Sequence, residues 1–276
     1  MSFQMTEEQR AATDGLRKLL DNVIEPEFLA HGEGFIPREK MLGLDWVTHL
    51  RLFEEVAYTS MDIAIPIVIN IVGADLLIQG ASQHLRDKYL PGLMNGDLFI
   101  SMGISEPDVG SDVAAVSTKA VRDGDHWVIN GEKTWISNGE YSDVFICTCK
   151  TGPGELTHIL IDREEHGYEV RGIPKMALNG QSTAQIFLTD VRVPVENVIG
   201  EVGGGLKNTL VTFERARCHM AAWGYSIGRR AMDEAIKYSQ ERTQHGKPIA
   251  GHQLVAEKIA VMATKIDAAR LLALRA

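Results

Sequence analysis

The sequence predicts an α+β protein made of three successive zones: an N-terminal α-helical domain (1–98), a middle β-domain (99–202) and an incomplete C-terminal helical bundle (203–276). Apolar residues recur at helical spacing in the first zone, alternate in short runs from Phe99, and return to helical spacing after Gly203-Gly204-Gly205. Because the short runs follow one another without helices between them, we expect an antiparallel β-barrel or sandwich rather than a parallel nucleotide-binding sheet.

The first zone carries several helix-start signals. Thr6-Glu7-Glu8-Gln9 has the pattern of a capping box, in which a hydroxyl and a carboxamide satisfy free backbone N–H groups. Pro26 and Pro91 should end the first and last helices, because proline cannot continue the hydrogen-bond ladder. The predicted helix caps are Thr6, Asp45, Ser60 and Ser82.

The second zone reads as a meander of strands. Asp123-Gly124 and Asn130-Gly131 are dipeptides that adopt the positive φ angles of tight hairpin turns, and they separate three β-type runs. We therefore expect one hairpin turn at each dipeptide. The expected strands are 119–122, 126–129, 133–136, 144–149, 158–161 and 186–193.

The third zone predicts two long helices. The first covers 206–244, Lys247-Pro248 breaks it, and the second runs over 253–276. Two amphipathic helices of this length leave much of their apolar faces unburied unless other helices cover them. The sequence ends in full helical periodicity, so we expect this bundle to be incomplete.

Composition narrows the function classes. The 276 residues include 28 Lys and Arg against 37 Asp and Glu, and no basic run, which argues against nucleic acid as a partner. Three cysteines without paired spacing predict neither disulfides nor a metal site. The most apolar stretch, 63–74, falls short of the ~18 residues of a membrane span, and the first residues show no targeting pattern. We expect a soluble cytoplasmic protein.

The densest polar pattern is the segment 103–114, Gly-Ile-Ser-Glu-Pro-Asp-Val-Gly-Ser-Asp-Val-Ala, which follows a predicted strand. Gly110 permits close backbone approach, and Ser105 and Ser111 can both donate and accept hydrogen bonds. Such a loop could hold a polar ring edge or a phosphate. The alternative interpretation is a solvated turn rich in aspartate.

Trp135-Ile136-Ser137-Asn138-Gly139 lies at the end of a predicted strand. Alternation places the flat ring of Trp135 and the hydroxyl of Ser137 on the same side, an arrangement that suits a flavin ring and its N5 atom. Taken alone, Trp135 is more typical of an ordinary core position.

The segment 242–253, which links the two C-terminal helices, is basic and interrupted by Gly and Pro. The guanidinium of Arg242 could bind a pyrophosphate in a forked geometry, or simply interact with the negative end of the helix dipole.

Together these three segments, in this order, resemble those of the acyl-CoA dehydrogenase family. The segment 103–112 is similar to its flavin loop, 135–139 to its strand against the isoalloxazine, and 242–253 to its dinucleotide-binding helix link. Arg192-Val193-Pro194 and Phe213-Glu214 extend the resemblance over nearly the whole chain. Each motif is weak alone, but three in order within the expected architecture make coincidence improbable.

The resemblance implies an FAD site and an acyl-CoA site. Ser105 would meet the pyrimidine edge of the flavin, Trp135 would lie against the ring, and Ser137 would donate to N5. The cofactor-binding residues implied are Met102, Ile104, Ser105, Gly110, Ser111, Trp135, Ile136, Ser137, Arg242, His245 and Gln253. The substrate-binding residues implied are Ser111, Phe213, Glu214 and Arg217.

The family's reaction removes the α-proton of an acyl-CoA thioester with a carboxylate while the β-hydrogen leaves as hydride to the flavin N5. The product is a trans-2-enoyl-CoA, and an electron-transfer flavoprotein reoxidises the flavin. Arg242, His245 and Gln253 would reach the adenosine diphosphate half of FAD in a neighbouring subunit, which implies a homodimer or homotetramer.

The chain departs from the family pattern at several points. The segment 41–44 joins two parts that relatives separate by additional residues, and His245 replaces an aromatic Phe. The usual catalytic Glu lies beyond two further C-terminal helices, and the alternative base position holds Ala216. We therefore assign no catalytic base. The two other carboxylates considered, Asp62 and Asp75, are interpreted as a helix cap and a surface carboxylate, respectively. A flavin monooxygenase or oxidase of the same fold, or an inactive FAD- or acyl-CoA-binding protein, are the alternatives.

Overall fold

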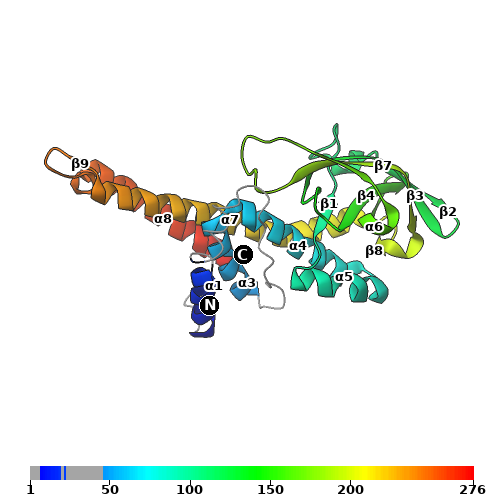
Figure 1. The fold of residues 1–276 in the computed structure, drawn as a ribbon, viewed down its shortest axis with the longest axis horizontal. Helices are drawn as coiled ribbons and strands as arrows, with labels where there is room; N and C mark the ends of the chain where they lie inside the picture. The colour runs from blue at the N-terminus through cyan, green and yellow to red at the C-terminus, as the bar shows by residue number, and fades with distance from the viewer. Residues whose placement is uncertain (1–6, 20–21, 23–45) are drawn as a thin grey trace. The chain divides into compact units, whose positions relative to one another are not determined.

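The computed structural model describes residues 7–19, 22 and 46–276, which form two compact units (Figure 1). One unit contains α1 (Glu7–Leu19), α3 (Trp46–Thr59), the first residues of α4 (Met61–Gly80) and the chain from Arg217. The other contains the rest of α4 and continues to Ala216. The predicted cap Thr6, the helix end at Pro26, the junction at 41–44 and the cap Asp45 lie outside the described residues.

The regular elements described in the first unit are helices, apart from one short hairpin. It includes most of α7 (Gly205–Glu241) and all of α8 (Gln253–Arg275), so the two long helices and the break between them are confirmed. The two helices are close at Gly228, where a Cβ would lie at an ordinary contact distance, 3.4 Å, from Cγ1 of Ile266. The hairpin pairs β9 (Thr243–Gln244) with β10 (Lys247–Pro248) between them.

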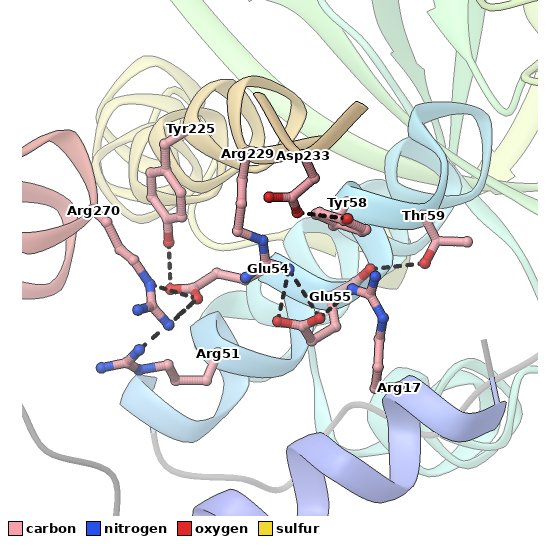
Figure 2. A network of polar contacts seen from close by, with 10 residues as sticks. All are labelled: Arg17, Arg51, Glu54, Glu55, Tyr58, Thr59, Tyr225, Arg229, Asp233 and Arg270. Carbon is pink, nitrogen blue, oxygen red and sulfur yellow. Dashed lines mark hydrogen bonds and ion pairs between the residues drawn. The ribbon is translucent and has the colours of Figure 1, made fainter. Parts of the chain in front are cut away.

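Two buried glutamates of α3 hold this unit together (Figure 2). Glu54 accepts hydrogen bonds from the Tyr225 hydroxyl at 2.5 Å and from Arg270 Nη2 at 2.7 Å. Glu55 accepts from Arg229 Nη2 at 2.9 Å, and Arg17 of α1 forms a second ion pair with it. Each carboxylate therefore links α3 to other helices, and the positive partners offset the cost of burying its charge.

Helix α4 is the one described helix that is long and apolar enough to cross a membrane. It has 20 residues and a mean hydropathy of 2.0. The sequence-based length included only the residues between Asp62 and Asp75 and was therefore too short. The helix extends past both aspartates, so length does not exclude a span. Because 72% of the apolar window is buried within the protein, α4 has the character of a core helix.

Helix α5 (Gln83–Asn95) begins as predicted but ends later. The Ser82 side chain accepts a hydrogen bond from Leu85 N at 3.3 Å, which confirms the cap. The prediction that Pro91 ends the helix is wrong, since proline removes only one backbone donor while the next turn still buries Leu93. Gly96 ends it instead, with φ of 75° and its N–H directed to the last carbonyls.

The second unit is built on one eight-stranded sheet of mixed direction. The strand order is β6-β7-β3-β2-β4-β5-β8, and β1 pairs with β4 in parallel. The sheet does not close into a barrel, so of the two predicted forms the sandwich describes it better. The strands are β1 (Ile100–Gly103), β2 (Lys119–Asp123), β3 (His126–Ser137), β4 (Val144–Gly152), β5 (Glu155–Asp162), β6 (Glu169–Gly172), β7 (Thr183–Pro194) and β8 (Val198–Ile199).

The core of this unit collects side chains from both halves of the sheet. Trp127 and Ile129 of β3 lie in one cluster with Phe145 of β4, Ile159 of β5 and Ile186 of β7. Strands that are distant in the sheet order thus share one apolar interior, so the sheet folds over on itself.

The Asn130-Gly131 dipeptide is a bulge within β3, and the predicted hairpin turn there is wrong. A Cβ on Gly131 would lie 2.7 Å from Cα of Thr118, so glycine is required for close approach of two backbones. Asn130 Nδ2 donates to Asp190 at 3.0 Å and fixes the bulge against β7. The Asp123-Gly124 turn between β2 and β3 is confirmed.

Candidate functional site

Two segments of the sheet unit meet to form a rim that carries most of the predicted cofactor residues. The first is the loop 104–112 that leaves β1, and the second is the end of β3, 135–137. Thr134 N donates to Ser105 O at 3.0 Å and joins them directly. Ser105 is half-buried, as are Met102 and Ile104, whereas Gly110 and Ser111 are exposed.

Trp135 has the most unusual environment on the rim. Its side chain is 64% exposed, and its φ of 61° lies in the left-handed region that a bulky residue rarely adopts. The pairing of β3 with β7 shifts between Lys133 and Ile136, so the bulge turns the ring outward. Ile136 points into the sheet core, which leaves only its backbone for a ligand, and Ser137 is half-buried.

The rim presents hydroxyl groups beside this exposed aromatic plane. Within the described part of the chain, no hydrogen bond engages the hydroxyls of Ser105, Ser111 or Ser137. Gly110 has open space where a Cβ would lie. An apolar plane with free donors beside it fits a flat heteroaromatic ligand with polar edges, such as a flavin.

A buried ion pair beneath the rim is absent from the sequence-based predictions. Lys133 Nζ lies 2.8 Å from Oε1 of Glu106, and the two side chains are 0% and 3% exposed. Burial alone would raise the pKa of Glu106, but hydrogen bonds from Lys133, Ser117 and Thr118 outweigh it and lower the pKa to about 2. The available signal was a lysine at an inward-facing strand position, two residues before Trp135.

Asn138 is a second residue that sequence reasoning missed, although it lies inside the recognised motif. It is buried, has a φ of 65°, and its Nδ2 donates to the carbonyls of Pro66 at 3.3 Å and Ile100 at 3.2 Å. Tyr141 donates to its Oδ1 at 2.8 Å. These contacts fix the chain just after Ser137, so the hydroxyl stands on a rigid support.

The remaining predicted cofactor residues lie in the helical unit. Arg242 and His245 are exposed at the hairpin between α7 and α8, and Gln253 begins α8. His245 has a φ of 51°, and its ring contacts that of His252 with centroids 6.0 Å apart. These three residues lie in the segment 242–253 that contains the hairpin, in a different unit from the rim.

Helix α7 carries the predicted substrate residues other than Ser111, which lies on the loop 104–112. Phe213 is half-buried, and Glu214 and Arg217 are exposed and three residues apart, so they lie on one helix face. At the alternative base position, Ala216 offers only a methyl group. Asp75 accepts from Gln79 Nε2 at 2.6 Å, in keeping with a surface carboxylate.

Metal chemistry has no support in the described residues. Among them, no three His, Cys, Asp or Glu side chains come together in a way that could hold an ion. All three cysteines are free thiols, and Cys147 and Cys149 lie in the sheet core.

Comparison with known proteins supplies independent findings. Residues 36–97, 101–191 and 203–276 match the N-terminal, middle and C-terminal domains of acyl-CoA dehydrogenase, respectively. The chain is 31% identical to a solved glutaryl-coenzyme A dehydrogenase in complex with glutaryl-CoA, with a TM-score of 0.94 over 100% of this chain and 77% of the other.

Three curated relatives are also similar. Glutaryl-CoA dehydrogenase of Desulfococcus multivorans is 36% identical over 85% of this chain and 62% of its own length. Cyclohexane-1-carbonyl-CoA dehydrogenase of Syntrophus aciditrophicus is 32% identical over 96% of this chain and 76% of its own length. Caffeyl-CoA reductase-Etf complex subunit CarC of Acetobacterium woodii is 36% identical over 74% of this chain and 55% of its own length. The chain therefore spans between 55% and 76% of the length of these relatives.

Proposed function

Because the chain belongs to the acyl-CoA dehydrogenase family, we propose that it binds FAD and oxidises an acyl-CoA thioester to a trans-2-enoyl-CoA. The observation that carries the proposal is the rim, where the exposed ring of Trp135 stands beside the free hydroxyls of Ser105 and Ser137. Its location at the ends of β1 and β3, two strands that each pair with neighbours within the sheet, suits a site that must hold a planar cofactor in one orientation.

On the rim, Trp135 would cover one face of the flavin, Ser105 would bond its pyrimidine edge, and Ser137 would donate toward N5. When bound, FAD supplies the acceptor for the hydride that leaves the β-carbon of the substrate. The protein's part is to align the ring, to exclude water from its face with an apolar side chain, and to fix donors before the reaction begins.

The proposed substrate is an acyl-CoA. The names of all three relatives specify CoA thioesters of carboxylic acids, which supports this class. Phe213 would contact the apolar part of the pantetheine arm, and Glu214 and Arg217 would bond its polar groups from one face of α7. Arg217 would contribute a positive charge to this surface.

We also propose that electrons leave to an electron-transfer flavoprotein and that the protein is a homodimer or homotetramer. The similarity to a subunit of an Etf complex supports the first. The exposed patch of Arg242, His245 and Gln253 supports the second, since it would bind the adenosine diphosphate half of FAD in a neighbouring subunit. Three free cysteines support a cytoplasmic location.

A second candidate is a protein that binds FAD and acyl-CoA without turnover. Ala216 favours it, because a methyl group at the alternative base position cannot remove the α-proton. A monooxygenase or oxidase that uses O2 is a further alternative, and formation of hydrogen peroxide would distinguish it from both candidates.

Steady-state assays of the FAD-loaded protein test these candidates. An artificial electron acceptor would replace the partner flavoprotein, and mass spectrometry would follow loss of two hydrogens from a panel of short, branched and aromatic acyl-CoAs. The proposal predicts enoyl-CoA formation that requires the acceptor. Tight acyl-CoA binding without product would select the binding protein, and product with hydrogen peroxide but no acceptor would select the oxidase.

A further inference from the structure

The loop 104–112 and the end of β3 are joined by more than the single contact between Thr134 and Ser105. Lys133 Nζ donates to the carbonyl of Ile104 at 3.1 Å as well as to Oε1 of Glu106 at 2.8 Å. One ammonium group of β3 therefore binds two residues that flank Ser105 in the loop. The position of Ser105 relative to β3 is thus fixed on both sides.

Glu106 also forms hydrogen bonds with residues at the other end of the loop. Its Oε2 accepts from Ser117 N at 2.8 Å and Ser117 Oγ at 2.5 Å, and its Oε1 also accepts from Thr118 N at 2.9 Å. Glu106 and Val109 exchange backbone hydrogen bonds at 2.9 and 3.1 Å, which closes the turn before Gly110. One carboxylate thus holds both ends of the loop that carries Gly110 and Ser111.

The same pair restrains Trp135 from the strand side. Lys133 is fixed by Glu106 and Ile136 by the sheet core, so the two positions that flank the bulge cannot shift freely. Gly103 allows this arrangement, because a Cβ there would lie 2.4 Å from Phe145 Cζ and 3.1 Å from Lys133 Cγ. The outward direction of the Trp135 ring therefore depends on residues that do not themselves reach the surface.

We propose that Lys133 and Glu106 are positioning residues of the cofactor site, which set the flavin-edge loop at a fixed distance from the Trp135–Ser137 strand end. This rests on the proposed function, because it presumes that FAD binds at the rim. Neither side chain touches the cofactor, and both act through Ile104, Ser105 and Trp135. A buried charged pair costs desolvation energy that an apolar pair would not, so its value here lies in directional contacts to several backbone groups.

The competing interpretation is that the pair only stabilises the fold. A purely structural pair would lower thermal stability when changed but leave the folded protein's affinity for FAD and the spectrum of the bound flavin unaltered. A positioning pair would change both properties in protein that is still folded. The test therefore needs a binding readout, a spectroscopic readout and a stability readout for each variant.

Glu106→Gln and Lys133→Met are the test variants, and Asn197→Ala is the matched control. The amide nitrogen of Gln cannot accept from Ser117 N–H, and Met keeps the apolar stem of Lys133 without its donors. Asn197 is a buried residue of the same unit whose Nδ2 donates to Leu160 O at 3.0 Å, away from the rim contacts. Its loss should reduce stability without moving the loop.

FAD titration of each apoprotein would give the dissociation constant, and difference spectra would report the resolution of the flavin's visible band. We expect Kd to rise about tenfold in both test variants, with a shifted or broadened band, and to stay within twofold in Asn197→Ala. Unchanged Kd and spectra in folded Glu106→Gln and Lys133→Met, with only a lower Tm, would overturn the proposal.

Ser117→Ala keeps the test decisive if both charged-pair variants fail to fold. Ser117 is exposed, and its change removes the 2.5 Å hydroxyl contact to Glu106 while leaving the ion pair. A two- to threefold rise in Kd is expected, and no rise would overturn the proposal. FAD binding by the wild-type protein is measured first. If the wild-type protein binds no FAD, the proposed function is refuted, and the variants are not needed for that conclusion.

Discussion

At the scale of single residues, Trp135 combines two costly features. A left-handed backbone at a bulky residue stores on the order of 1–3 kcal/mol, and an exposed indole forgoes the burial that most tryptophans gain. The neighbouring residues Lys133 and Ile136 maintain this conformation through their own burial. Strain held in place by its surroundings is a feature of ligand-binding sites, and it is the reason for placing the flavin here.

Replacing Ser137 with Ala tests the hydroxyl at the rim. We expect FAD to remain bound and the rate of flavin reduction by acyl-CoA to fall about tenfold, because one hydrogen bond to the reacting edge is lost. Stopped-flow absorbance at the visible flavin maximum measures this rate. Ser182→Ala is the control, since that hydroxyl bonds the Glu140 N–H at 3.0 Å instead. An unchanged rate in Ser137→Ala would remove this residue from the mechanism.

His158 gives the sheet unit a defined pH dependence. Its ring nitrogens lie 3.0 Å from Thr148 Oγ1 and 3.0 Å from Thr209 Oγ1 in a buried site, and burial lowers its pKa to about 4. The unfolded chain binds this proton more readily, with a pKa of about 6.5, so the free energy of unfolding decreases as pH falls from 6.5 through 4.

The expected decrease attributable to His158 is up to about 3 kcal/mol across that pH window. Urea unfolding at several pH values would measure it. His158→Gln, which retains hydrogen-bonding groups but does not titrate, should flatten the slope between pH 6.5 and 4. The control variant His84→Gln removes an exposed histidine and should leave this slope unchanged. Equal slopes in wild type and His158→Gln would show that another group is responsible.

At the scale of elements, α5 shows which helix signals are reliable. The start at Ser82 follows from a local side-chain contact, whereas the end depends on whether the turn after Pro91 is buried. Sequence spacing contains the first kind of information and not the second. The same reasoning explains Asn130-Gly131, which has the composition of a turn but serves as a bulge because Thr118 of a neighbouring segment passes so close.

Gly96→Ala tests the end of α5. A Cβ in the left-handed region costs about 1 kcal/mol, so Tm should fall by about 2–4 °C. Differential scanning calorimetry measures the change. Met94→Ala, at an exposed position of the same helix, is the control and should have little effect. A Tm equal to wild type would mean that the helix ends elsewhere.

The glutamates of α3 allow a second test at this scale. Glu54→Gln would leave the Arg270 guanidinium and the Tyr225 hydroxyl without their carboxylate, and should reduce the free energy of unfolding by about 2–3 kcal/mol. Urea unfolding of Glu54→Gln, Arg270→Met and the double variant gives the coupling energy. Strictly additive effects would show that the contact contributes no coupling of its own.

At the scale of the whole molecule, the sequence predicts the order of the zones well. Helical and alternating periodicities are local patterns, so the described helices α1, α3, α4 and α5, the longer strands β2, β3, β4, β5 and β7, and the break between α7 and α8 could be located in advance. The short strands β6 and β8 were not predicted. Whether the sheet closes into a barrel could not be predicted, because strand order depends on distant pairings such as β1 with β4.

The site was only partly predictable for the same reason. Trp135 and Ser137 stand in a short recognisable motif, and their place at the rim follows from it. The Lys133–Glu106 pair joins residues 27 positions apart, and although the strand position of Lys133 faces inward, nothing local identifies Glu106 as its partner. Predictions from pattern therefore identify the groups that face a ligand more readily than the groups that position them.

The most direct test of the central claim is anaerobic reduction of the bound flavin by acyl-CoA. Protein loaded with FAD would be mixed with acyl-CoAs of the relatives' classes, glutaryl-CoA and cyclohexane-1-carbonyl-CoA among them, while absorbance at the visible flavin maximum is recorded. The proposal predicts bleaching with one equivalent of enoyl-CoA formed per flavin. A protein that holds FAD but stays oxidised with every acyl-CoA would contradict it.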